Sequence, residues 1–239
     1  MHALDSQQPA AAGSAAARDP RPGAKFAVEA IGTFFLVFTC GAAAGSGSTL
    51  APLAIGAVLM VMVYAGGHIS GGHYNPAVTL AVLVRRGIGA RDAAGYWIAQ
   101  CVAGVVAAAV VRWIVGPVHA GAPAHRPAAV FVVEALFTFA LCYVVLNVAT
   151  RSRDRGNSYF GLAIGFTVVS GVFAVGGISG GLFNPAVTVA AVAMGIIAWP
   201  ALWIYVAAQG VAAAAAGIAF LLLDPDERRS GRNASESAI

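Results

Sequence analysis

The chain has 239 residues, of which 59% are hydrophobic and only 10% are charged, and its formal net charge at pH 7 is +4. This composition is too apolar for a soluble domain with an ordinary polar surface, so the sequence indicates a membrane protein. The basic residues form no cluster in a polar folded region, which argues against nucleic-acid binding.

Six apolar stretches are long enough to cross a bilayer, because a helix needs about 20 mostly apolar residues to span a hydrocarbon core of about 30 Å. Residues 1–24 are rich in Ala, Pro and Gln and lack an apolar core, so they are predicted to be a disordered tail rather than a signal peptide. Residues 224–239 are predicted to be a second disordered tail. The predicted spans are Lys25–Gly45, Leu50–Gly67, Ala93–Val115, Ala128–Ala149, Tyr159–Gly176 and Trp199–Leu223.

The distribution of basic residues predicts the orientation of the chain. Twelve of the 14 Lys and Arg residues lie before the first span, after the sixth, or in the loops that follow the second and fourth. Only Arg112 and Arg126 lie on the other side. Since basic residues concentrate in cytoplasmic loops, we expect a multi-pass protein of the cytoplasmic membrane with both termini in the cytoplasm.

The chain contains an internal repeat. Residues 68–79 (HISGGHYNPAVT) recur as residues 177–188 (GISGGLFNPAVT), at an offset of 109 residues. Residues 26–34 (FAVEAIGTF) recur as residues 131–139 (FVVEALFTF), at an offset of 105. Each half has three spans, so the second half enters the membrane from the opposite side, as in an inverted repeat. The predicted folded domain covers residues 25–223, with repeat one at 25–115 and repeat two at 128–223.

Each half also contains a segment that is apolar but too short to span. The segments Pro76–Arg85 and Pro185–Met194 have ten residues each, and at 1.5 Å per residue a helix of this length covers about half a bilayer. In each, an Asn that can cap the helix precedes a Pro at the first helical position. The glycine pairs before them predict non-helical backbone, which is tolerated at this depth only where it lines a cavity. These pairs are Gly66-Gly67, Gly71-Gly72, Gly176-Gly177 and Gly180-Gly181.

Two half-helices that enter from opposite sides meet near the midplane, and their N-termini converge there. Asn75 and Asn184 would then present side-chain amides to a passing oxygen, while the positive helix ends repel cations. A pore between the two halves is the expected result.

At this point the sequence resembles the aquaporin, or major intrinsic protein, family. The resemblance covers residues 25–223 and rests on two NPA motifs in matching register, on six spans, and on Glu29 and Glu134 in equivalent spans. It implies an all-α membrane protein with six transmembrane helices and two re-entrant half-helices in an inverted 3+3 repeat. It also implies a homotetramer in which each subunit conducts water or small neutral solutes passively, without a cofactor. The two motifs are Asn75, Pro76 and Ala77, and Asn184, Pro185 and Ala186.

Glu29 and Glu134 are the only acidic residues inside the long spans, and a carboxylate in a membrane is costly enough to indicate a function. We expect each to accept hydrogen bonds from backbone amides of a re-entrant loop, although a proton relay is the alternative. By resemblance, His68 braces its loop and His73 lies towards the cytoplasmic mouth and lines the pore. A histidine with only a structural hydrogen bond is an equally good interpretation for either.

The four positions of the family's selectivity filter are located in this sequence by counting residues from the NPA motifs. Water-selective members usually have an aromatic residue, a histidine, a small residue and an arginine at these positions. An arginine-less filter offers few groups to replace lost hydration, so we expect slower water passage and less hindrance to ammonia, hydrogen peroxide or carbon dioxide. In this chain the four positions are Ile55, Val172, Gly181 and Val187.

Two further positions bear on the solute. Thr188 stands where glycerol-conducting members typically have Asp, which argues against a glycerol facilitator. Tyr205 resembles the pattern of water channels, but Val206 stands where a Trp often follows.

Two alternatives to a passive channel follow from the sequence. An ion-coupled secondary transporter is one, since inverted repeats are common in that class. A non-conducting junction or scaffold protein is another. An enzyme is not expected, because there is no nucleophile with a partnered base and no phosphate loop. Cys40, Cys101 and Cys142 all lie in apolar spans, so neither a disulfide nor a metal site is expected.

Overall fold

The computed structural model of the chain describes residues 23–118, 126–151 and 156–227. All the regular structure in these ranges is helical. Six of the helices are long and apolar enough to cross a membrane, and α3 and α7 are short apolar helices between them. The helices are α1 (Ala24–Ser46), α2 (Ala51–Ser70), α3 (Pro76–Val84), α4 (Ala90–Ile114), α5 (Pro127–Ala149), α6 (Phe160–Ser179), α7 (Pro185–Met194) and α8 (Leu202–Leu223), with a 3₁₀ turn at Trp199–Ala201 before α8.

The predicted spans are confirmed to within a few residues at their ends, with one correction. Helices α2 and α6 both continue three residues further than expected, through Ser70 and Ser179. The pair Gly66-Gly67 and its counterpart Gly176-Gly177 are therefore helical, and the non-helical loops are residues 71–75 and 180–184. Gly66 is a packing position, because the Tyr74 side chain lies where its Cβ would be.

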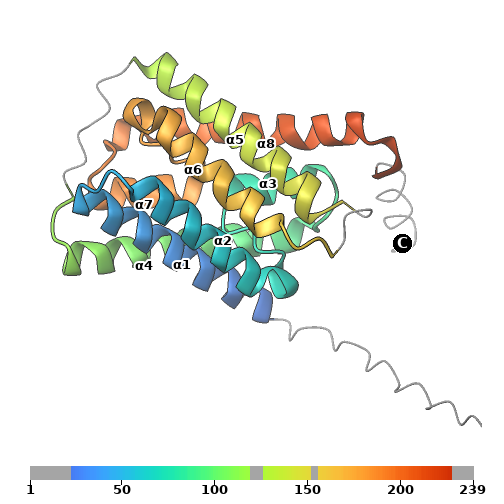
Figure 1. The fold of residues 1–239 in the computed structure, drawn as a ribbon, viewed down its shortest axis with the longest axis horizontal. Coiled ribbons are helices and arrows are strands. Elements are labelled where there is room, and N and C mark those ends of the chain that lie inside the picture. Colours follow the sequence, from blue (N-terminus) through green and yellow to red (C-terminus); the bar gives the residue numbers. More distant parts are fainter. Residues whose placement is uncertain (1–22, 119–125, 152–155, 228–239) are drawn as a thin grey trace, which may run out of the picture.

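The two halves of the chain interlock. Helices α1 to α4 form the first half and α5 to α8 the second. The half-helix α3 packs against α8, and α7 packs against α4, so each is held by a long helix of the other half. Figure 1 shows that α1 begins and α8 ends at the same end of the bundle. We call this end the basic side, because Arg85 and Arg151 also lie there.

Helices α2 and α6 cross at two equivalent glycines. Gly56 and Gly165 are separated by the repeat offset of 109 residues. A Cβ atom on Gly165 would lie 2.5 Å from the carbonyl oxygen of Gly56 and 2.8 Å from the Cβ of Met60. Only the hydrogen atom of a glycine fits between the two backbones here, so the crossing brings the two halves of the chain into close contact.

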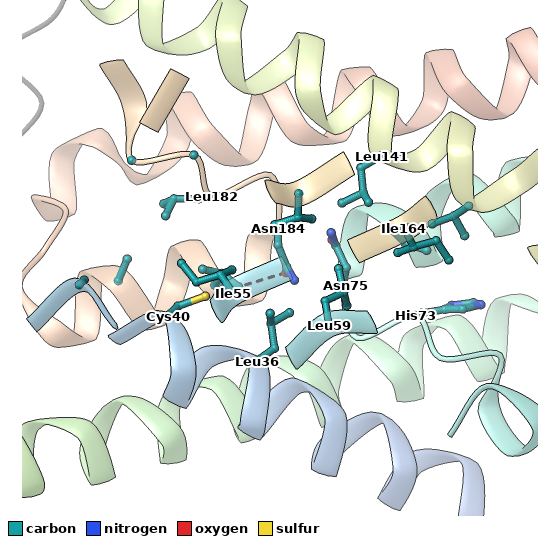
Figure 2. Close-up of a pocket in the computed structure, with 18 of the residues that line it drawn as sticks. Leu36, Cys40, Ile55, Leu59, His73, Asn75, Leu141, Ile164, Leu182 and Asn184 are labelled. Atoms are coloured by element: carbon teal, nitrogen blue, oxygen red, sulfur yellow. Dashed lines mark hydrogen bonds between the residues drawn. The ribbon is translucent and has the colours of Figure 1, made fainter. Parts of the chain in front are cut away.

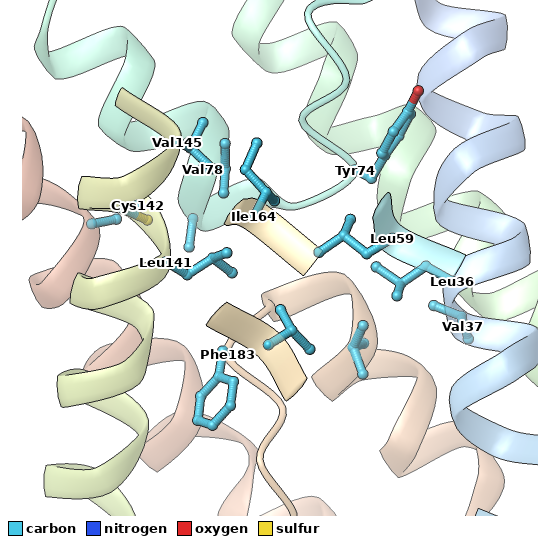
Figure 3. Packing of buried hydrophobic residues seen from close by; sticks show 14 of the residues in the cluster. Leu36, Val37, Leu59, Tyr74, Val78, Leu141, Cys142, Val145, Ile164 and Phe183 are labelled. Atoms are coloured by element: carbon cyan, nitrogen blue, oxygen red, sulfur yellow. The ribbon is translucent and has the colours of Figure 1, made fainter. Parts of the chain in front are cut away.

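A core of apolar side chains surrounds the half-helices, and the labelled side chains in Figure 3 come from both halves. Val37, Leu146 and Cys142 have no exposed surface. The short helices cannot bury an apolar face by themselves, so this packing holds them at the centre of the bundle.

The prediction of a disordered tail from residue 224 onward is wrong for its first four residues. The Asp224 carboxylate lies 2.8 Å from Nε of Arg151, and Glu227 Oε2 lies 3.9 Å from Nη1 of Arg85. Both partners come from loops distant in sequence, which composition cannot reveal. Residues 1–22 and 228–239 of the expected tails lie outside the described residues.

Candidate functional site

A cavity of about 140 Å³ lies at the centre of the bundle. Figure 2 shows the two asparagines of the NPA motifs at its middle, with Cys40, Ile55 and Leu182 on one side and His73 and Ile164 on the other. The cavity is lined by residue pairs that are equivalent in the repeat, 109 positions apart. These pairs are Ile55 and Ile164, Leu59 and Val168, Gly72 and Gly181, His73 and Leu182, Asn75 and Asn184, and Val78 and Val187.

Each NPA asparagine caps its own half-helix and also contacts the other half. Asn75 Oδ1 accepts a hydrogen bond from the backbone N–H of Ala77 at 2.8 Å, as expected of an N-cap residue. Its Nδ2 donates to the carbonyl of Phe183 at 2.9 Å. Asn184 caps α7 through Ala186 N–H at 2.9 Å and donates to the Tyr74 carbonyl at 2.9 Å. An amide carries two N–H groups, so each Asn has a second donor on the cavity.

The residue before each asparagine has an unusual backbone conformation. Tyr74 has φ 48° and Phe183 has φ 49°, in the left-handed region that bulky residues rarely adopt. Their carbonyls are the acceptors for the opposite asparagines. Tyr74 and Phe183 were not predicted as part of the site, although an aromatic residue directly before each Asn is visible in the sequence. The strain lies where the two halves join, which is typical of functional sites.

Glu29 accepts four hydrogen bonds at the loop of the first half. Its Oε1 accepts from the Ser70 hydroxyl at 2.7 Å and from the His73 N–H at 2.9 Å. Its Oε2 accepts from the Tyr74 N–H at 2.6 Å and from Nε2 of Gln100 at 2.8 Å. These are the backbone contacts that the sequence predicted for Glu29. The side chain is fully buried and does not line the cavity, so its carboxylate stabilises the loop through these hydrogen bonds.

The second half repeats this network residue for residue. Glu134 accepts from Ser179 and Leu182 through Oε1 and from Phe183 and Gln209 through Oε2, at 2.7–3.0 Å. A second contact is also equivalent in the two halves. In each half, a tyrosine hydroxyl donates to the carbonyl of the last residue of the long helix that precedes the loop. Tyr96 donates to Ser70 at 2.7 Å and Tyr205 donates to Ser179 at 2.8 Å.

The two histidines near the first NPA motif have different environments. The loop-bracing prediction for His68 is wrong, because in the described chain its side chain is exposed and makes no hydrogen bond. α2 continues to Ser70, and two residues in a helix differ in direction by about 200°, so Ser70 faces the loop and His68 faces away. His73 is 8% exposed and lines the cavity. Its Nδ1 lies 3.0 Å from Oγ1 of Thr79.

Three of the four predicted filter residues lie on the cavity. Ile55, Gly181 and Val187 line it, and Val172 does not. A Cβ on Gly181 would lie 3.1 Å from the Cα of Val172, so the loop packs closely against this residue. Counting residues from Asn184 could not show this contact, which depends on the left-handed backbone of Gly181 at φ 66°.

Comparison with known proteins identifies the family. A family model described as major intrinsic protein matches residues 24–172 and again residues 160–238. This chain belongs to the major intrinsic protein family. The chain is 41% identical over 202 residues to the glycerol uptake facilitator protein-like 6 of Lactiplantibacillus plantarum, with 79% of this chain and 93% of that protein covered.

Other members of the major intrinsic protein family are also similar. Aquaporin NIP2-1 of Oryza sativa subsp. japonica is 41% identical over 193 residues, which cover 76% of this chain and 64% of that protein. The X-ray structure of the aquaglyceroporin from Plasmodium falciparum matches with a TM-score of 0.71 and 17% identity, covering 81% of this chain and 93% of that one. The structural match supports the fold. Members of this family are membrane channels and not enzymes.

This major intrinsic protein also has a second cavity, on the basic side. It is lined by Arg85, Asp92 and Thr150, among others, and it shares His73 and Val145 with the central cavity. Arg85 donates to the Thr150 carbonyl, and its Cζ lies 5.4 Å from the centre of the Phe220 ring. We call this second cavity the vestibule. His73 therefore lies at the neck between the vestibule and the central cavity.

Proposed function

We propose that this major intrinsic protein is a passive channel for water and small neutral solutes in the cytoplasmic membrane. The observation that carries the proposal is the central cavity, which passes both NPA asparagines and opens towards a vestibule on the basic side. Two half-helix N-termini converge at the asparagines, which favours oxygen-bearing neutral solutes and disfavours cations. The names of the relatives, an aquaporin and a glycerol facilitator-like protein, agree with this class of solute.

The lining of the cavity supports an apolar, arginine-less filter at Ile55, Gly181 and Val187, with Val172 behind Gly181. A water molecule that enters such a ring loses hydrogen bonds without replacement. Ammonia and carbon dioxide are less strongly hydrated than water and are hindered less. We therefore propose that the channel conducts these solutes well relative to water, and that Thr188 disfavours glycerol.

The arrangement in the membrane is also part of the proposal. The basic side faces the cytoplasm, so both termini are cytoplasmic. Large apolar side chains such as Ile98, Leu136 and Trp203 are more than 60% exposed on the outer surface of the single chain. Lipid and the neighbouring subunits of a homotetramer would cover such side chains.

The proposed function is tested with purified protein in proteoliposomes. Wild-type vesicles should exceed empty vesicles in permeability to at least one of five solutes: water, ammonia, hydrogen peroxide, urea and glycerol. The flux should be linear in solute concentration and indifferent to ion gradients. A protein that conducts none of the five, or that shows saturable and gradient-dependent flux, would contradict the proposal.

Val187→Arg should reduce ammonia and peroxide permeability by about tenfold and water permeability by less, because a guanidinium restores donors that water can use. The matched control is Val187→Leu, which changes the size of the side chain and adds no polar group. Stopped-flow measurements on the same vesicles give all three permeabilities. Equal loss for every solute in the arginine variant would show that polarity at this position does not select.

The thiol of Cys40 offers an independent test of the path, because Cys40 lines the central cavity and Cys101 and Cys142 do not. Mercuric chloride should inhibit wild-type flux, since a mercury adduct on Cys40 occupies the lumen. Cys40→Ser should lose this sensitivity, whereas Cys101→Ser should retain it. Inhibition that persists in Cys40→Ser would place the solute path elsewhere.

A further inference from the structure

The repeat has a consequence for the shape of the central cavity. The predicted filter consists of Ile55, Gly181 and Val187 on the side away from the vestibule. The positions equivalent to them in the other half are Ile164, Gly72 and Val78, and all three also line the cavity. Figure 2 shows Ile55 and Ile164 on opposite sides of the asparagines.

The backbone around the two sets of residues is also equivalent. Gly72 has φ 64° and Gly181 has φ 66°. A Cβ on Gly72 would lie 3.4 Å from the Cα of Val63, and a Cβ on Gly181 would lie 3.1 Å from the Cα of Val172. Val63 and Val172 are themselves equivalent in the repeat, and neither lines the cavity. The two sets therefore line the cavity with equivalent backbone and side chains.

The two sets differ in one adjacent side chain. His73 lines the cavity on the vestibule side, and its equivalent on the other side is Leu182. Thr79 Oγ1 lies 3.1 Å from the Asn75 carbonyl and 3.0 Å from Nδ1 of His73, and its single hydrogen can be donated to only one of them. With the Thr79 hydroxyl donating to the Asn75 carbonyl, Nδ1 of His73 carries the imidazole hydrogen and Nε2 is left as a hydrogen-bond acceptor. Within the described chain no group donates to Nε2.

We infer that the pore has a second selectivity ring, formed by Gly72, Val78, Ile164 and His73, in series with the predicted filter. The inference deepens the proposed function and rests on it. The filter is apolar all round, whereas the second ring offers one acceptor at Nε2 of His73. A solute with a hydrogen to donate, such as water, ammonia or hydrogen peroxide, is stabilised there. Carbon dioxide has no such hydrogen and gains nothing.

Two rings in series predict a specific result for a solute that is larger than water. If both rings limit the passage of urea, a variant that widens one ring still has the other ring at its original width. Urea permeability then rises by no more than about twofold. Ile55→Ala and Ile164→Ala are the matched single variants, and the double variant should exceed wild type by at least about tenfold. If Ile55→Ala alone raised urea permeability by about tenfold, and the double variant raised it no further, there would be no second ring.

His73→Leu tests the acceptor and copies the residue that the second half carries at the equivalent position. Loss of one hydrogen bond should lower water permeability by about fivefold and leave carbon dioxide permeability unchanged. His73→Gln, which keeps an acceptor, should restore most of the water flux. Equal loss of water and carbon dioxide flux in His73→Leu would mean that His73 only holds the loop, and would overturn this part of the inference.

Failure of the inference and failure of the proposed function are distinguishable in the same vesicles. A wild type that conducts none of the five solutes defeats both. A wild type that conducts normally, combined with single-ring behaviour of the isoleucine variants, defeats the second ring alone.

Discussion

Replacing Glu29 by Ala is expected to prevent formation of a stable channel. The change leaves four donors without their acceptor in a fully buried site: two backbone N–H groups, the Ser70 hydroxyl and the Gln100 amide. Each buried donor without a partner costs about 1–3 kcal/mol, so the expected loss in unfolding free energy exceeds about 4 kcal/mol. Size-exclusion chromatography and thermal unfolding in detergent measure this loss.

The matched controls are Thr33→Val and Thr138→Val. Both threonines are fully buried in the same helices as the two glutamates, and among the described residues their hydroxyls have no hydrogen-bond partner. Replacing them with valine removes a polar group that makes no hydrogen bond, so stability should be unchanged or higher. If Glu29→Ala were as stable as these controls, the glutamate would not be supporting the loop.

Glu29→Gln separates loop support from a proton relay. Gln keeps one acceptor oxygen but turns an N–H₂ group towards two donors, so we expect reduced stability and unaltered selectivity in the protein that still folds. A coupled transporter would instead keep its stability and lose gradient-driven flux. Glu134→Gln should behave in the same way, because its four contacts are equivalent to those of Glu29.

Gly165→Ala is the second change for which we expect a large effect. The new Cβ would lie 2.5 Å from a backbone oxygen of α2, and a backbone cannot move aside as the end of a flexible side chain can. The two helices must separate, and we expect a loss of about 3 kcal/mol in unfolding free energy. Because the loops of both pore halves follow α2 and α6, flux per folded protein should fall as well.

Gly177→Ala in the same helix is the control for Gly165→Ala. No atom lies within 4 Å of the position that its Cβ would take. An Ala in place of Gly within a helix stabilises by about 0.5–1 kcal/mol, so this variant should unfold at a higher temperature than wild type. Thermal unfolding of the two variants side by side checks both expectations. Similar stability in both would show that the crossing tolerates a side chain.

The sequence was sufficient to predict the fold because the two halves repeat the same pattern. Span length, the 109-residue offset and the odd number of spans per half together required an inverted arrangement, and the structure has it. The contacts of Glu29 and Glu134 with the loops were also predicted, because loop amides that lipid cannot satisfy need an acceptor at that depth.

Other features depend on three-dimensional packing and could not be predicted. Gly66 looks like a helix break in sequence, but it makes room for the Tyr74 ring. Val172 lies at the predicted number of residues before Asn184, but it packs against Gly181 and does not line the cavity. The ion pair of Asp224 with Arg151 joins segments that are far apart in the chain.

The crossed hydrogen bonds of the NPA asparagines bear on how the chain assembles during synthesis. Asn75 donates to Phe183, and Asn184 donates to Tyr74. When only the first half has been inserted, the amide of Asn75 has no acceptor and the Tyr74 carbonyl has no donor from the missing half. The hydrogen bonds at the centre of the pore therefore cannot form before residues 180–186 have been added. It follows that the first half alone cannot fold to a finished half-pore, whereas the two halves synthesised as separate chains have every contact needed to complete each other.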